Sequence, residues 1–309
     1  MRMLVVGAGA LGGYFGARLA AAGRDVTFLV RPARARQLAE RGLRVVSPHG
    51  DFAIVPRTVV AGAIEGAYDV VLIATKAYGL AAAMEDVAPA VGAATAILPT
   101  LNGMRHLDAL TARFGAEKVL GGTAVIIATL GAEGEVRQIM PNHRLTFGEL
   151  AGGMNARVQA IDGFMQGAGF VARASDAVLL DMWEKWITIA ALAAGTCLMR
   201  GTVGDILAAP GGRETLLALL EECRATAAAC GVAPRAAVLG SVTTMLTAEG
   251  SPVAASMLRD MEAGGQTEAD HILGDLIARA EQQGVATPLL RLAWCHMGTH
   301  EARRARQRP

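Results

Sequence analysis

A glycine-rich segment near the start of the chain constrains the fold more than any other feature. An apolar run at residues 3–6 leads directly into a G-x-G-x-x-G pattern, and an amphipathic stretch follows at residues 11–22. A strand, a glycine turn and a helix in this order form the first unit of a dinucleotide-binding fold. The alternative is a glycine-rich turn that holds no ligand. The six residues of the pattern are Gly7, Ala8, Gly9, Ala10, Leu11 and Gly12.

Each glycine of the pattern has a separate expected task. Gly7 allows the tight turn, Gly9 lets a pyrophosphate approach the backbone, and Gly12 lets the helix pack closely on the strand. The free N–H groups at the helix start would then face two phosphates.

Segments with strand and helix character alternate through the first half. Residues 25–30, 69–74 and 96–98 are short apolar runs, typical of parallel strands buried on both faces. Residues 43–47 and 52–55 favour a hairpin, and residues 119–127 and 144–148 add further strands. This alternation predicts an α/β Rossmann-type doubly wound sheet.

Helical periodicity dominates from about residue 176. Residues 186–199, 214–230, 267–283 and 288–300 are predicted helices, with Thr267 as the N-cap of the third and Gly284 at its end. We therefore expect a dinucleotide-binding domain at residues 1–174 and an all-α substrate and catalytic domain at residues 175–309.

Charge and cysteine content exclude several classes of function. A formal net charge of +1 gives no reason to expect nucleic acid or anionic lipid as a partner. The basic cluster at residues 303–308 is interpreted as a solvated, frayed terminus. The four cysteines form no C-x-x-C pair and have no histidine at metal-ligand spacing, so we expect reduced thiols and no metal site.

The chain also lacks the pattern of a membrane or secreted protein. No apolar run reaches the roughly 18 residues that a transmembrane helix needs. The apolar start resembles a signal peptide, but glycines and Arg18 interrupt it. We expect a cytoplasmic protein; a homodimer formed through the helical half stays open.

The end of the second predicted strand indicates which nicotinamide cofactor binds. Enzymes that prefer NAD place an acid about 20 residues after the glycines, where it accepts a hydrogen bond from the ribose 2′-OH. Here Arg31 stands at that place, and no acid follows before Glu40. A guanidinium suits a 2′-phosphate, so we expect NADP(H).

Polar residues stand at several places where a bound cofactor or substrate would find a partner. Lys76 and Asn102 each follow a predicted sheet strand, and ligands of open α/β sheets bind at those strand ends. Lys185 interrupts an apolar helix, and Ser256 and Glu268 lie in the helical half. Each residue alone also has an ordinary explanation, such as a surface lysine, a turn asparagine or a first-turn acid.

Together these residues resemble the ketopantoate reductase family, the 2-dehydropantoate 2-reductases, over nearly the whole chain. The family's lysine and Asn-Gly motifs are matched by Thr75-Lys76 and Leu101-Asn-Gly-Met104. Its Trp-x-Lys helix is matched at Trp183 and Lys185. Its Ser-Met-x-x-Asp and Thr-Glu-x-Asp-x-x-x-Gly signature is matched by Ser256, Met257 and Asp260, then by Thr267, Glu268, Asp270 and Gly274.

The resemblance implies NADPH-dependent reduction of a 2-oxo acid, with a helical domain of the 6-phosphogluconate-dehydrogenase type. It makes Lys185 the general acid, and a lysine with a lowered pKa suits proton transfer near neutrality. It implies that Glu268 orients hydroxyl groups and tunes Lys185, and that Asn102 bridges cofactor and substrate. Lys76 would lie near the nicotinamide and Ser256 would hold the substrate carboxylate. The backbone near Ile126 would contact the cofactor.

Three departures from the family pattern bear on the substrate. Asparagines that usually stand four and eight residues after the lysine, and three before the serine, are replaced by Ile189, Ala193 and Val253. We therefore expect a 2-oxo acid that is larger or less polar than ketopantoate. His271, on the face of Glu268, is interpreted as a surface or packing residue, with a substrate contact as the alternative.

Two other functions remain open from the sequence. An opine dehydrogenase on the same architecture would lack the spacing of Ser256 and Glu268. A non-catalytic NADP-binding or regulatory protein would explain the lost asparagines but not the intact Lys185 and Glu268.

Overall fold

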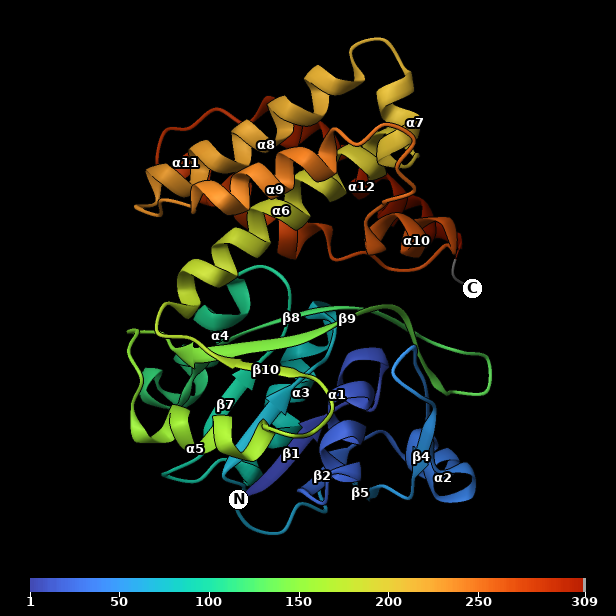
Figure 1. Ribbon diagram of the computed structural model, residues 1–309, viewed down its shortest axis with the longest axis vertical. Coiled ribbons are helices and arrows are strands. Elements are labelled where there is room, and N and C mark those ends of the chain that lie inside the picture. Colours follow the sequence, from blue (N-terminus) through green and yellow to red (C-terminus); the bar gives the residue numbers. More distant parts are fainter. Residues whose placement is uncertain (308–309) are drawn as a thin grey trace. The chain divides into compact units, whose positions relative to one another are not determined.

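The computed structural model describes residues 1–307, which divide into two compact units. The first comprises Met1–Leu101 and His106–Leu179. The second joins the short segment Asn102–Arg105 to the chain from Leu180 onward. In Figure 1 the first unit runs from blue to yellow-green, and most of the second runs from yellow to red.

A five-stranded parallel sheet forms the centre of the first unit. Its order is β5-β2-β1-β6-β7, with β1 at Arg2–Val6, β2 at Asp25–Leu29, β5 at Arg57–Val59, β6 at Val70–Ile73 and β7 at Ala96–Pro99. The associated helices are α1 (Ala10–Ala21), α2 (Pro32–Arg41), α3 (Leu80–Val87) and α4 (Arg105–Phe114). The predicted α/β Rossmann-type sheet is confirmed, and β5 is a strand that the sequence did not predict.

A second sheet was not predicted as a separate layer. It contains β3 (Leu43–Val46), β4 (Phe52–Ile54), β8 (Leu120–Leu130), β9 (Val136–Glu149) and β10 (Val171–Ala174). Helix α5 (Ala156–Met165) packs against β9 and β10. The predicted hairpin of β3 and β4 is present, with Val45 opposite Phe52. β8 and β9 form an antiparallel hairpin longer than the two predicted strands, because each pairs with the other through nearly its whole length.

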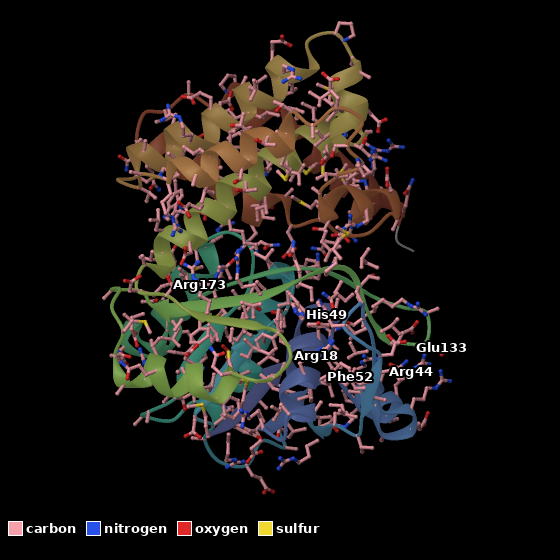
Figure 2. All side chains as sticks on the ribbon, in the orientation of Figure 1. Arg18, Arg44, His49, Phe52, Glu133 and Arg173 are labelled. Atoms are coloured by element: carbon pink, nitrogen blue, oxygen red, sulfur yellow. The ribbon has the colours of Figure 1, made fainter. Side chains whose placement is uncertain are left out.

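Helix α1 packs against both sheets, and its side chains belong to one continuous hydrophobic core with theirs. Arg18 on this helix fixes the hairpin of β3 and β4. Its guanidinium lies 4.6 Å from the centre of the Phe52 ring (Figure 2). Its Nη2 donates a hydrogen bond of 3.0 Å to Ser47 Oγ. Helix α1, which starts in the glycine pattern, is therefore held by both sheets.

The second unit is helical, as predicted. Its helices are the long α6 (Val178–Met199), then α7 (Val203–Ala208), α8 (Gly212–Ala229), α9 (Ala236–Leu246), α10 (Ser256–Glu262), α11 (Asp275–Gln282) and α12 (Pro288–Gln307). A π-helical turn at Asp270–Gly274 precedes α11.

Two predicted helix ends are wrong. Thr267 is no N-cap, because the helical backbone begins only at Ala269; the Thr267 N–H donates instead to Glu301 Oε1 at 2.7 Å. The basic tail is not frayed, because α12 continues to Gln307 and Arg304 pairs with Glu301 at 2.8 Å. Arg308, the last arginine of that cluster, lies outside the described residues. The predicted end at Gly284 is confirmed by its φ of 69°, two residues beyond α11.

Within residues 1–307 no helix is both long and apolar enough to cross a membrane. In the same range no group of three or more histidine, cysteine, aspartate or glutamate side chains could hold a metal ion. Cys197 and Cys223 are buried free thiols, whereas Cys295 is exposed.

Candidate active site

The glycine pattern forms a tight loop between β1 and α1. Gly7 has a φ of 93°, which a residue with a side chain rarely adopts, and its N–H donates to Leu29 O at 2.9 Å. A Cβ atom at Gly12 would lie only 2.2 Å from Gly7 O, so glycine is required there for the helix to begin so close to the strand. At Gly9, by contrast, an added Cβ would meet nothing within 4 Å.

The end of β6 lies beside this loop. β1 and β6 are parallel neighbours with Val6 opposite Ile73, so Gly7 and Thr75 both lie at the carboxyl edge of the sheet. A Cβ at Gly7 would be 3.8 Å from Thr75 Cγ2. The strand order changes direction between β1 and β6, which is where open α/β sheets bind ligands.

Two observations fit a dinucleotide at this edge. The space over Gly9 is open, as a close pyrophosphate requires. Thr75 Oγ1 is buried and has no hydrogen-bond partner among the described residues. Buried polar atoms are rarely left unpaired, so this hydroxyl is suited to a hydrogen bond with a ligand oxygen. Lys76, the next residue, is exposed.

Two arginines at the start of α2 differ in what they contact. Arg31 directly precedes the helix, is exposed, and has a side chain without a hydrogen bond or ion pair within residues 1–307. Arg34 Nη2 donates to Ala8 O at 3.0 Å and to Gly134 O at 2.8 Å. Burial lowers the pKa of Arg34. Arg31 is thus free for a ligand, whereas Arg34 ties the glycine loop to the turn between β8 and β9.

Ile126 lies half-buried on β8, opposite His143 of β9. The pairing of the two strands shifts between Ile126 and Ala128, the mark of a β-bulge. Bulges often lie next to functional sites because they redirect the neighbouring backbone.

A second group of candidate residues lies in the helical unit, around Lys185 on α6. Burial lowers the pKa of Lys185 to about 8, and the charge of Glu268 partly opposes that shift. Glu268 is 6% exposed and stands just before the π-helical turn. Trp186, next to Lys185, donates from Nε1 to Ile272 O at 2.9 Å, so α6 is fixed to that turn.

Asn102 joins this group through His271. It is half-buried, and its backbone accepts a hydrogen bond from the His271 ring. A Cβ at Gly103 would lie 2.9 Å from His271 O, so the two segments approach closely. His271 is 8% exposed, and burial lowers its pKa against the opposing charges of Glu268 and Asp275. Of the two interpretations of His271, surface or packing residue, the structure supports packing: its buried side chain links Asn102 to the segment that carries Glu268.

Ser256 is exposed at the first position of α10. The preceding residue, Ala255, donates from its backbone N–H to Thr196 Oγ1 of α6 at 3.3 Å. Thr196 Oγ1 itself donates to Leu192 O at 2.7 Å. The start of α10 is therefore held on α6, eleven residues beyond Lys185.

The residues that replace the expected asparagines lie along the same helix. Ile189 is half-buried one turn after Lys185, and Ala193, a further turn on, is 2% exposed. Residues four apart share a helix face, so Lys185 is followed by an apolar stripe. Val253, in the loop before α10, is half-buried.

The predicted site residues thus form two groups. The glycine pattern, Arg31, Lys76 and Ile126 belong to the first unit; Lys185, Glu268, Asn102 and Ser256 belong to the second. Sequence reasoning missed Arg34, and it named Thr75 only as part of the Thr75-Lys76 motif, without a role of its own. Thr75 could have been noticed from its place at a strand end, but nothing in the sequence indicates that Arg34 bonds to Ala8.

Comparisons with known proteins assign both parts of the chain to one family. Residues 3–152 match the family model described as ketopantoate reductase PanE/ApbA, and residues 177–300 match the model of its C-terminal part. The chain is 39% identical to the uncharacterized oxidoreductase YkpB of Bacillus subtilis, covering 98% of this chain and 99% of that protein. It is 28% identical to a 2-dehydropantoate 2-reductase of Mesorhizobium japonicum, covering 88% and 89% of the two chains.

Solved structures show the same fold. The crystal structure of a 2-dehydropantoate 2-reductase from Geobacter metallireducens superposes with a TM-score of 0.88 at 29% identity, over 97% of this chain and 99% of the other. A D-mandelate dehydrogenase solved with NADH and anilino(oxo)acetate has a TM-score of 0.88 at 20% identity, over 99% and 100% of the two chains.

Proposed function

The chain belongs to the ketopantoate reductase family of oxidoreductases, and on that premise we propose that it reduces a 2-oxo acid to the 2-hydroxy acid with NADPH. In this proposal residues 1–174 are the dinucleotide-binding domain and residues 175–309 the catalytic domain. The nicotinamide cofactor, when bound, supplies the hydride that the carbonyl carbon of the substrate accepts.

The glycine loop and Arg31 hold the cofactor. The free N–H groups at the start of α1 face the pyrophosphate, because a helix N-terminus attracts anions. The side chain of Arg31 binds the 2′-phosphate with charge-assisted hydrogen bonds. Thr75, Lys76 and the backbone at Ile126 contribute further contacts, and Arg34 holds the loop in shape through Ala8.

Lys185 donates the proton that the carbonyl oxygen needs as it becomes an alcohol. Its ammonium also stabilises the negative charge developing on that oxygen. Glu268 keeps Lys185 protonated near neutral pH and orients hydroxyl groups of the ligand. Asn102 binds cofactor and substrate, with its backbone fixed by His271, and Ser256 binds the substrate carboxylate.

One observation carries the proposal: the pKa of Lys185 is lowered to about 8 by burial, with Glu268 acting against the shift. General acids work best when their pKa lies near the working pH.

The apolar stripe beyond Lys185 supports a substrate less polar than ketopantoate. Ile189, Ala193 and Val253 offer no side-chain hydrogen bond to a hydroxyl group. A hydroxyl left without its partner costs about 1–3 kcal/mol. We therefore propose a 2-oxo acid whose side chain is apolar.

The test is a screen of 2-oxo acids with the full-length protein, following NADPH oxidation by absorbance. The panel pairs ketopantoate with aliphatic and aromatic 2-oxo acids of similar size. We expect turnover with at least one apolar acid, and a loss of at least about 100-fold in kcat for Lys185→Ala. NADPH affinity, measured by calorimetry, should stay unchanged in this variant.

Tight NADPH binding without turnover of any acid would contradict the proposal and indicate a non-catalytic NADP-binding protein. Unchanged kcat in Lys185→Ala would contradict the role of the lysine alone.

A further inference from the structure

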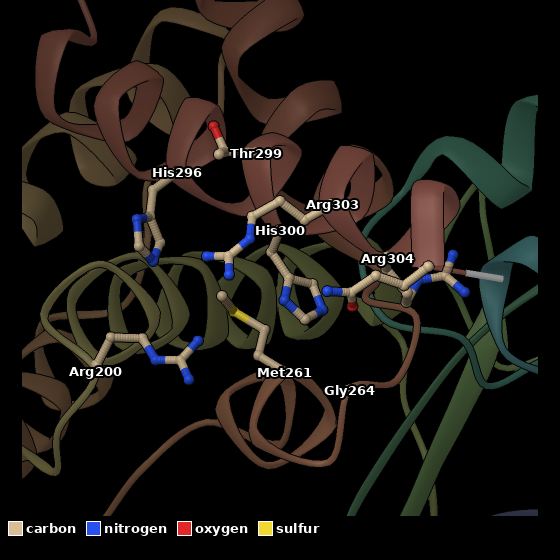
Figure 3. A pocket seen from close by; sticks show the side chains of 9 residues that line it. Arg200, Met261, Gly264, His296, Thr299, His300, Arg303 and Arg304 are labelled. Carbon is tan, nitrogen blue, oxygen red and sulfur yellow. The ribbon is translucent and has the colours of Figure 1, made fainter.

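The helical unit contains a pocket of about 260 Å³ with a basic wall (Figure 3). Arg200, at the end of α6, faces α12 residues His296, His300, Arg303 and Arg304, and Met261 of α10 supplies an apolar surface. No aspartate or glutamate is among the described residues that line it. The pocket thus gathers five groups that are or can become cations.

Several of these groups have unused hydrogen-bonding capacity. Arg304 pairs with Glu301 through Nη2, but its Nη1 is buried without a partner within residues 1–307. His296 Nε2 is likewise buried and unpartnered there. Arg200 and Arg303 form no hydrogen bond or ion pair in the described part of the chain. Buried donors without acceptors are costly, so the pocket is suited to an oxygen-rich anion.

The backbone conformation of Arg200 positions its side chain at the pocket. Arg200 has a φ of 57°, and among the described residues it is the one non-glycine residue with positive φ. Such a conformation is typical of the residue that ends a helix, and the following N–H, that of Gly201, donates to Thr196 O at 3.2 Å as it does at such helix ends. It ends α6 and leaves the guanidinium at the pocket.

The pocket shares no lining residue with the two groups of candidate site residues described above. All of its lining residues belong to the helical unit, so it shares none with the glycine loop. Arg200 follows Lys185 by fifteen residues along α6, which at 1.5 Å per residue places its backbone about 22 Å from that of the lysine.

We propose that this pocket binds a small organic phosphate. Guanidinium groups match the geometry of phosphate oxygens and form charge-assisted hydrogen bonds with them. One water molecule occupies about 30 Å³ in the liquid, so a pocket of about 260 Å³ has room for an organic group beside a phosphate. Met261 offers the organic part an apolar contact. The proposal goes beyond the reductase function and does not depend on it.

The experiment is calorimetric titration of the full-length protein with glycerol 3-phosphate, with NADP⁺ at saturation to fill the glycine loop. Inorganic phosphate is titrated in parallel. We expect one site per chain and tighter binding of the organic phosphate. Because a hydrogen bond to a charged group is worth about 1.5–3 kcal/mol, Arg303→Gln should weaken binding by roughly 10- to 150-fold.

Arg306→Gln is the matched control, since Arg306 is also exposed on α12 but does not line the pocket. It should change the affinity by less than about twofold. Arg200→Gln tests the opposite wall and should act like Arg303→Gln. The thermal unfolding midpoint of each variant establishes that it is folded.

Absence of phosphate binding to the unmodified protein would overturn the proposal. Equal losses of affinity in Arg303→Gln and Arg306→Gln would overturn it too, because they would show that only the overall positive charge of α12 attracts the phosphate. Equal affinity for glycerol 3-phosphate and inorganic phosphate would contradict the proposal, because it would mean that the pocket binds the inorganic ion without recognising an organic group. Dissociation of an oligomer by Arg303→Gln, measured by light scattering, without phosphate binding would assign the pocket to contact with a second copy.

Discussion

Glu268 opposes the effect of burial on Lys185: desolvation lowers the pKa of the lysine, and the nearby carboxylate raises it, leaving it at about 8. Both residues belong to the helical unit, with Glu268 just before the π-helical turn to which Trp186 is hydrogen-bonded. The protonation state of the proposed acid therefore depends on a contact that a single substitution can remove.

This pair sets the pH dependence of reduction. Lys185 must be protonated to donate, and the ammonium form predominates below its pKa of about 8. We expect kcat to be level below that pH and to fall about tenfold per pH unit above it. In Glu268→Gln the charge that raises the pKa is gone, so the fall should begin at a lower pH.

The control for this profile is Glu262→Gln, which removes an exposed carboxylate from α10 and should leave the fall where it was. A profile of Glu268→Gln that loses amplitude at every pH but keeps the same midpoint would contradict the electrostatic role of Glu268.

Two glycines of the loop should respond differently to alanine. Gly12→Ala places a methyl group 2.2 Å from Gly7 O and should lower the unfolding midpoint. Gly9→Ala meets no protein atom within 4 Å and its φ of −84° suits alanine, so the fold should persist. NADPH affinity should nevertheless fall at least about tenfold, because the methyl group occupies the space of the pyrophosphate.

Calorimetry and thermal unfolding of both variants check this expectation. Unchanged NADPH affinity in a folded Gly9→Ala protein would mean that the loop does not bind the pyrophosphate.

The two arginines of α2 should separate cofactor choice from loop support. Arg31→Ala should remove most of a preference for NADPH over NADH that we expect to be at least about tenfold, or 1.4 kcal/mol. Arg34→Ala removes the hydrogen bonds to Ala8 and Gly134 and should weaken both cofactors alike. Dissociation constants for NADPH and NADH in the three proteins distinguish these effects; equal affinities in the unmodified protein would refute the assignment of Arg31.

Ile189 offers the most direct test of substrate choice. Ile189→Asn places an amide one helical turn from Lys185 at a half-buried position that tolerates it better than the 2%-exposed Ala193 does. The ratio of kcat/KM for ketopantoate to that for the best apolar acid should rise roughly 5- to 150-fold, the equivalent of 1–3 kcal/mol. Ile189→Val, which shortens the side chain without polarity, is the matched control.

If the unmodified protein already prefers ketopantoate, the apolar stripe does not set the specificity. His271 would then be the next polar group to test, since Thr196 is already bonded to Leu192 and Ala255.

The sequence predicted those parts of the fold that depend on local pattern. β1, the glycine loop and α1 were placed because strand, turn and helix each have their own periodicity within a few residues. The second sheet was not, because the pairing of β3 with β9 joins Val45 to Val136, far along the chain. Local pattern carries little information on such pairings.

In the candidate site, too, the residues within local motifs were predictable, and the contacts between distant segments were not. Lys185, Glu268 and the glycines were found from motifs, whereas the burial of His271 and its bond to Asn102 depend on two distant segments meeting. Thr267 has the residue type of an N-cap, but its N–H bonds to Glu301 and the helix begins later. Arg34 was passed over because its neighbour Arg31 has the same side chain and only the structure separates their contacts.

The π-helical turn at Asp270–Gly274 has a spectroscopic consequence. The chain has three tryptophans, Trp183, Trp186 and Trp294, and all lie in the helical unit. The indole of Trp186 donates to Ile272 O, and that of Trp294 donates to Asp270 Oδ1 at 2.7 Å. Tryptophan fluorescence, excited where the three tyrosines of the first unit do not absorb, therefore reports on the helical unit, and two of the three tryptophans are bonded to the turn that follows Glu268. Binding of any ligand that moves this turn should therefore change the tryptophan emission, and it can be followed without an attached dye.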